Sequence, residues 1–265
     1  LLAGAILGPL VILNWLIIRR NEDTSKRSTF ASNLALGLII WQGALGWLTV
    51  KIDNIHWSVA MHLSSALAFI LCLIWLWICI NRDEGIQPSW LEFDPILASK
   101  WKNRIAWLGL STFTTVFAGV FVATTPGADQ ICGVSGDVNS WPLCNGDYLP
   151  EIVDLEGQSQ IIHRWLVAFV GGILLIACWY VRNEQIQHQH GIILRNWIWA
   201  ATALYCLNIA IGALYILSWS PDNETFREIL SLIHLLVGST SFLTLATSWL
   251  AISAFALHEP EPEAL

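Results

Sequence analysis

Seven long apolar runs are the feature of this sequence that most limits its fold. They lie near residues 1–18, 30–50, 57–80, 105–125, 162–181, 197–218 and 227–256. A helix needs about 20 apolar residues to cross a hydrocarbon core of roughly 30 Å, and each run has about that length. The chain is 55% hydrophobic and 12% charged, unlike a typical soluble domain. The runs therefore predict an all-α, polytopic membrane helical bundle.

The positions of Lys and Arg predict how this bundle is oriented. Ten of the 13 cations fall in alternate connections, which marks those connections as the cytoplasmic or matrix side. They are Arg19, Arg20, Lys26, Arg27, Arg82, Lys100, Lys102, Arg104, Arg182 and Arg195. The loop 126–161 is then on the outer side, and it has acidic residues but no Lys or Arg. This charge pattern argues for the lipid bilayer, and against nucleic acid, as a partner.

An internal repeat relates the two ends of the chain. The most informative matches are Gly8 with Gly172, Trp15 with Trp179, Gly43 with Gly212 and His62 with His234, at offsets of 164 to 172 residues. Both copies run in the same direction, which predicts two tandem four-helix repeats about an axis along the membrane normal. Since the sequence predicts seven helices rather than eight, we expect the first helix of the first copy to precede Leu1. We expect a histidine and an arginine immediately before Leu1, corresponding to His163 and Arg164.

The runs and the repeat together divide the chain into four parts. Residues 1–80 form an incomplete N-terminal half-bundle, and residues 81–104 form an inner connecting loop. Residues 105–256 form the C-terminal four-helix half-bundle. The remaining residues, 257–265, are too polar and too rich in proline to order themselves, and form a tail.

Three histidines lie in or at the mouth of spanning runs, near the outer level: His62, His163 and His234. Facing histidines are a common way for a helical bundle to hold a haem. His163 and His234 can face each other across the second half, while His62 faces the expected upstream histidine in the first. A hydrogen-bonded core histidine is the alternative. Zinc suits these positions less well, because no Cys or carboxylate lies at ligand spacing.

Arg164 opens a helix at its N-terminal end, where the helix dipole disfavours a cation. The arginine therefore needs an anionic partner, and an outward-pointing haem propionate would supply one. Arg227 and Lys51 are the other two outer cations. They can act in the same way or contact lipid headgroups.

Cys132 and Cys144 lie in the outer loop, in an oxidising compartment, which predicts a disulfide between them. A structural role is favoured over a redox role, because no cation that could activate a thiolate stands nearby in sequence. The redox role remains open as a third reading, that of a disulfide-exchange protein.

Several of these residues resemble the haem A synthase family. The family's outer-loop pattern is carried by Trp141, Pro142, Leu143, Cys144, Asn145, Gly146 and Pro150, followed by His163 and Arg164. The run Gln42, Gly43, Ala44, Leu45, Gly46, followed by His62 and Leu63, looks like the helix pair that ends the first half, and Ile233 and His234 look like the last helix. The resemblance covers essentially the whole chain.

The resemblance implies an enzyme of two four-helix halves that oxidises a methyl group of haem O to the formyl group of haem A. His163 and His234 would bind the iron of a haem b, and His62 would be the catalytic-side ligand facing the iron of the substrate haem O. The family's cysteine pair maps onto Cys132 and Cys144. The implied location is a prokaryotic plasma membrane or the mitochondrial inner membrane. The implied partners are haem O synthase and terminal oxidase assembly, with oligomerisation left open.

The chain departs from the family pattern at one functional position. The family's acidic residue before the first-half histidine would precede Leu1, and its second-half counterpart here is Gln160 or a neighbour, none of them a carboxylate. Histidines on helices also fit a second function. A di-haem b-type membrane cytochrome that takes electrons from quinol is the alternative to the synthase.

Overall fold

The computed structural model describes residues 2–128, 131–132, 141–144, 147–148, 155–186, 191–218, 220 and 224–256. Seven long helices fill most of these ranges: α1 (Leu2–Arg20), α2 (Lys26–Lys51), α3 (His56–Asp83), α4 (Pro95–Thr124), α5 (Leu155–Gln185), α6 (Gly191–Leu217) and α7 (Glu224–Ala251). A short helix, η1 (Ser89–Leu91), precedes α4, and η4 (Ile252–Ala256) continues α7. No strand occurs in the described part of the chain, so the all-α prediction is confirmed. The predicted tail 257–265 lies outside it.

Six of these helices, α2 to α7, are long and apolar enough to cross a membrane. α1 is the shortest of the seven, at 19 residues. Large apolar side chains are exposed along the helices, as expected where lipid rather than water surrounds a bundle. The chain is an integral membrane protein with a polytopic helical bundle, as the apolar runs predict.

The connection between the halves is shorter than the predicted loop 81–104. α3 continues to Asp83, and α4 already begins at Pro95. The early start has a local cause: the Asp94 side chain accepts a hydrogen bond from the Leu97 amide at 2.8 Å, and proline occupies the first helical turn. Likewise, the loop predicted to extend to residue 161 ends where α5 begins, at Leu155.

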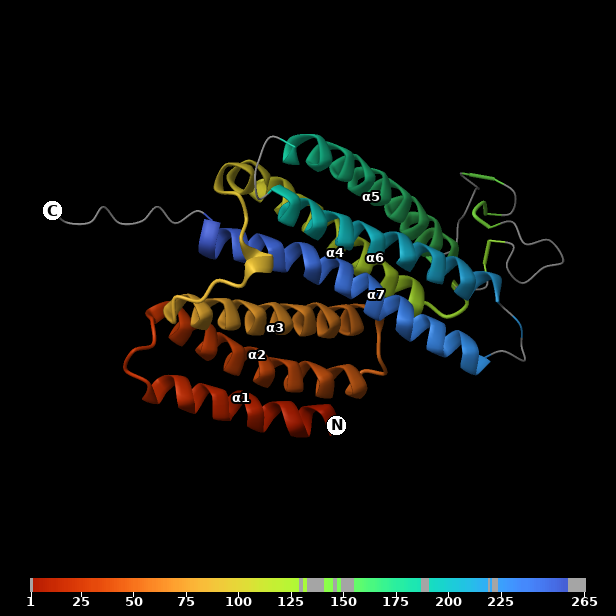
Figure 1. Cartoon of the computed structure of the whole chain (residues 1–265). Coiled ribbons are helices and arrows are strands. Elements are labelled where there is room, and N and C mark those ends of the chain that lie inside the picture. The colour runs from red at the N-terminus through yellow and green to blue at the C-terminus, as the bar shows by residue number, and fades with distance from the viewer. Residues whose placement is uncertain are drawn as a thin grey trace.

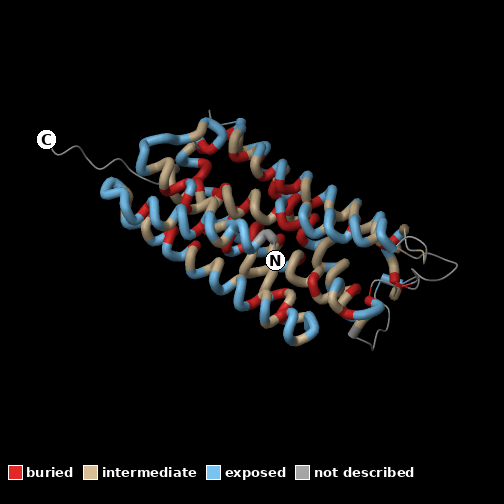
Figure 2. Tube along the Cα trace, turned by 90° about the horizontal axis from the view of Figure 1, so that it is seen from below, coloured by how far each residue is buried: buried red, intermediate tan, exposed pale blue. Residues whose placement is uncertain are grey.

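The helices α4 to α7 pack as a ring of four. α4 contacts α5 and α7, and α6 contacts the same two helices, so α5 and α7 occupy opposite corners. The largest buried apolar cluster lies within this ring and includes Trp101, Leu174, Ile198 and Leu245. Figure 1 shows this group beside the row formed by α1, α2 and α3, with α3 next to α7. In Figure 2 the buried positions lie mainly along the inward faces of the helices.

The two ends of the bundle differ in chemistry. At one end, which we call the basic end, Lys100 and Arg104 of α4 pair with Glu184 of α5 at 3.0 and 3.4 Å. At the opposite end, which we call the loop end, α2 passes to α3, α4 to α5 and α6 to α7. All three histidines singled out from the sequence lie in the parts of their helices nearest the loop end.

Candidate functional site

Each of the three histidines rests against a glycine of the helix that precedes it in the chain. A Cβ atom added to Gly46 of α2 would lie 3.1 Å from Cε1 of His62 on α3. At Gly119 of α4 the corresponding distance to His163 of α5 is 3.1 Å, and at Gly212 of α6 the distance to His234 of α7 is 2.8 Å. Real Cβ contacts are rarely this short, so the imidazoles take up space that only glycine leaves free.

Two of these imidazoles belong to helices of the ring α4 to α7. His163 and His234 project from α5 and α7, the opposite corners of the ring. That the two imidazoles face each other across the ring stays a prediction.

His234 is held by a hydrogen bond that fixes its tautomer. Its Nδ1 lies 2.9 Å from the backbone carbonyl of Asn208 on α6. Because a carbonyl only accepts, Nδ1 carries the hydrogen, and Nε2 keeps a lone pair that can bind a metal. The Nδ1 atom of His163 is also buried, but it has no hydrogen-bond partner among the described residues.

His62 in the first half has different surroundings. The Gln42 side-chain amide donates to the His62 backbone carbonyl at 3.1 Å, and its Nε2 lies 3.4 Å from Nε2 of the imidazole. The Ser65 hydroxyl donates to Oε1 of Gln42 and also contacts the His62 carbonyl at 3.1 Å. Nδ1 of His62 is buried, with no partner among the described residues. The amide therefore faces the nitrogen that a metal would use.

The contacts revise one detail of the repeat. The sequence matches Gly43 with Gly212, yet the glycine that touches His62 is Gly46, while no atom comes within 4 Å of a Cβ at Gly43. Gly46 and Gly212 are each preceded, four residues earlier, by an amide residue, Gln42 or Asn208. Four residues make about one helical turn, so the amide and the glycine lie on one helix face. This shared spacing is the signal that could have identified the pairs.

Arg164 binds backbone carbonyls of the loop that precedes its helix. Its Nη1 donates to the carbonyl of Leu143 at 2.9 Å and more weakly to that of Pro142 at 3.4 Å. Nη2 is buried without a partner among the described residues, so one donor remains for the predicted propionate. The next loop residue, Cys144, forms a disulfide with Cys132. Of the family's loop pattern, Asn145, Gly146 and Pro150 lie outside the described residues.

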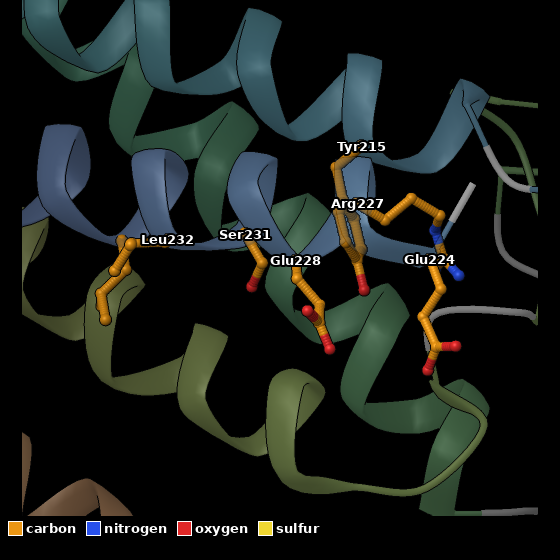
Figure 3. A pocket seen from close by; sticks show the side chains of 7 residues that line it. Tyr215, Glu224, Arg227, Glu228, Ser231 and Leu232 are labelled. Atoms are coloured by element: carbon orange, nitrogen blue, oxygen red, sulfur yellow. The ribbon is translucent and has the colours of Figure 1, made fainter.

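The other two loop-end cations stack on aromatic rings. Lys51 lies 5.0 Å from the ring centre of Trp47 on its own helix. Arg227 of α7 lies 4.8 Å from the ring centre of Tyr215 on α6. Arg227 and Tyr215, with Glu224, Glu228 and Ser231, line an open hollow of about 530 Å³ (Figure 3). The role at a haem propionate that the sequence suggested for Lys51 and Arg227 remains a prediction.

Two further residues lie near the loop end of the bundle. His56 begins α3 and is half-buried. Its Nδ1 lies 2.9 Å from Oγ1 of Thr124, and its ring stacks on Phe121, so it joins the loop ends of α3 and α4. Gln160, three residues before His163, is buried.

Comparison with protein families agrees with this arrangement. The model of the family described as cytochrome oxidase assembly protein matches residues 2–246. The chain belongs to this family. The family resemblance inferred from the loop pattern and the histidines is thereby confirmed.

Individual relatives in the family are distant but extensive. A protein of Shouchella clausii named Heme A synthase is 25% identical over 184 residues, which cover 69% of this chain and 58% of that protein. The Heme A synthase of Symbiobacterium thermophilum is 25% identical over 221 residues, covering 82% of this chain and 66% of that protein. The Heme A synthase of Halalkalibacterium halodurans is 24% identical, covering 92% and 75%. The chain thus spans less than two thirds of the first two relatives. No solved structure matches it.

The residues present fit a haem between His163 and His234. The two imidazoles stand on helices at opposite corners of one ring, and each is seated against a glycine. The His234 tautomer leaves Nε2 free to ligate, and the buried Nη2 of Arg164 is an unused donor for an acidic substituent. Within the described residues no cluster of three or more His, Cys, Asp or Glu could hold a bare metal ion.

Proposed function

We propose that this chain is a haem A synthase, which oxidises a methyl group of haem O to the formyl group of haem A within the membrane. The family match and the names of the relatives support an oxidoreductase of this kind. The observation that carries the proposal is the repeated seat: three imidazoles, each against a glycine of the preceding helix, distributed over two halves.

The second half, residues 105–256, would hold the resident cofactor. His163 and His234 are the iron ligands of a haem b, and Arg164 contacts one of its propionates. When bound, this haem supplies one-electron redox chemistry. The chain's contribution is positional: Asn208 orients the His234 ring, and Gly119 and Gly212 let both rings lie close to the neighbouring helices.

The first half, residues 1–80, would hold the substrate. His62 would be the ligand for the iron of haem O, and the Gln42 amide, which accepts a hydrogen bond from Ser65, faces that imidazole. Apolar surroundings on α2 and α3 exclude water from the reacting group, which suits a reaction on a hydrophobic macrocycle.

The proposal extends to sidedness and partners. The loop end of the bundle faces the outer side of the plasma membrane or of the mitochondrial inner membrane, because the basic end carries most of the cations. Haem O arrives from a haem O synthase, and haem A leaves for the assembling terminal oxidase. A di-haem cytochrome serving quinol finds no support in the relatives described above, which carry the name Heme A synthase.

The deciding experiment is haem analysis in a host that makes haem O but no haem A. Expression of the full-length protein should produce haem A, identified by chromatography of extracted haems. His62→Ala should abolish haem A while leaving bound haem b in the membrane protein. Electron transfer from quinol without any haem A would instead establish the cytochrome function.

A further inference from the structure

The Gln42 side chain occupies the face of His62 that a substrate iron would need. Its amide nitrogen contacts Nε2 of the imidazole at 3.4 Å and the His62 carbonyl at 3.1 Å. Since Oε1 accepts from the Ser65 hydroxyl, the orientation of the amide is fixed, with the nitrogen toward the histidine. Three hydrogen-bonding contacts therefore hold one side chain over the ligating atom.

The second half lacks this arrangement at the same place. Asn208 stands four residues before its glycine, as Gln42 does, but it contacts His234 through its backbone carbonyl and at Nδ1. Its side-chain nitrogen instead lies near Gly238, one turn farther along α7. No side chain among the described residues donates to Nε2 of His234.

We propose that Gln42 is a positioning residue that makes His62 an exchangeable haem ligand. This inference rests on the proposed function and goes one step beyond it. In the empty site the amide of Gln42 caps Nε2 of His62. When haem enters, the amide gives up this contact and keeps its bonds to Ser65 and to the His62 carbonyl. When the product leaves, the amide caps the imidazole again.

The two halves need this difference because a substrate site must release its product, whereas a cofactor site must retain its haem. A hydrogen bond to the free ligand nitrogen stabilises the empty site and so weakens haem binding. Typical net hydrogen-bond strengths correspond to roughly a two- to tenfold change in the dissociation constant. The 3.4 Å separation places Gln42 toward the lower end of that range.

The test is a haem b titration of the full-length protein in lipid nanodiscs, with the dissociation constant and release rate measured by absorbance. Gln42→Leu removes the amide at similar size. It should tighten binding at His62 by roughly two- to tenfold and slow release by a similar factor. Gln42→Asn, whose shorter amide cannot reach Nε2, should act in the same direction and covers the case in which the leucine variant fails to fold.

Two controls separate this inference from the proposed function. Gln87→Leu removes an equivalent amide, which donates to the Leu91 carbonyl far from the site, and should leave haem binding unchanged. In a His62→Ala background, Gln42→Leu should have no effect. If both Gln42 variants leave binding at His62 unchanged or weaker, the inference is wrong. If His62→Ala itself alters no haem site, the proposed role of the first half fails instead.

Discussion

His62 and His234 lie on α3 and α7, and different atoms hold them. Each ring lies against a glycine that follows an amide residue by one helical turn. At His234 a backbone carbonyl accepts from Nδ1. At His62 a side-chain amide faces Nε2, and Nδ1 is left buried without a partner among the described residues.

On the proposed function, this difference would suit the two sites to two purposes. A hydrogen bond at Nδ1 orients an imidazole and makes Nε2 a better ligand. An amide at Nε2 competes with any metal for the same lone pair. On this proposal, the change from a backbone contact to a side-chain contact would separate the site that retains haem from the site that exchanges it.

Replacing His62 or His234 should produce the largest difference in haem binding between the two halves. We expect His234→Ala in the full-length protein to lose the low-spin b-type absorbance almost completely, because it deletes an iron ligand. The haem affinity should fall by more than the about 10- to 100-fold that is typical when a residue hydrogen-bonded to a metal ligand is removed. His62→Ala should retain this absorbance. Equal losses in both variants would mean that the halves do not differ in this way.

The disulfide should affect the loop end of the second half without entering the chemistry. Cys144→Ser breaks the disulfide in the loop that Arg164 contacts, and should lower the free energy of unfolding by about 2–4 kcal/mol. Haem A production per folded molecule should persist. Cys206→Ser, at an exposed free cysteine, is the matched control and should change neither. Loss of activity with unchanged stability in Cys144→Ser would favour the disulfide-exchange reading.

The glycine seats allow a graded comparison. Gly212→Ala should weaken haem retention in the second half by roughly 1–3 kcal/mol, since the new methyl would lie 2.8 Å from Cε1 of His234. Gly46→Ala should do less at His62, where the distance is 3.1 Å. Gly172→Ala has no atom within 4 Å and serves as control. If all three variants bind haem with the same affinity, the contacts between these glycines and the histidines do not affect haem binding.

The smallest effect is expected at Ser65. Ser65→Ala removes the hydroxyl that fixes the Gln42 amide, so haem binding at His62 should change in the same direction as in Gln42→Leu, by about twofold. The neighbouring Ser64 donates only to the Ala60 carbonyl, and Ser64→Ala should leave the titration unchanged. A larger change at Ser64 than at Ser65 would contradict the proposed role of this hydroxyl.

Much of the fold could be read from the sequence because spanning length and composition are properties of each segment alone. Every predicted run falls on one long helix, with α7 extended by η4, and reaches at most one residue beyond it. The ends of the helices were harder to predict, because a capping residue can start a helix before its apolar run begins. Asp94 followed by Pro95 is such a start signal, and weighting it would have shortened the predicted connection.

The site was only partly predictable, because contacts depend on how far one helix is shifted along another. The level of the histidines follows from counting along each run. Which of Gly43 and Gly46 contacts His62 does not follow from counting, and the sequence match with Gly212 does not identify Gly46 as the contact. The backbone carbonyls that Arg164 contacts belong to a loop, where no periodic sequence pattern predicts which residues will meet.

The central claim is that the second half retains its haem while the first half exchanges it. The most direct measurement is the transfer of haem b from the loaded full-length protein to an excess of haem-scavenging apoprotein, followed by absorbance. We predict two phases, with the fast phase absent in His62→Ala and the slow phase absent in His234→Ala. A single phase, or a fast phase that disappears with His234, would contradict the account.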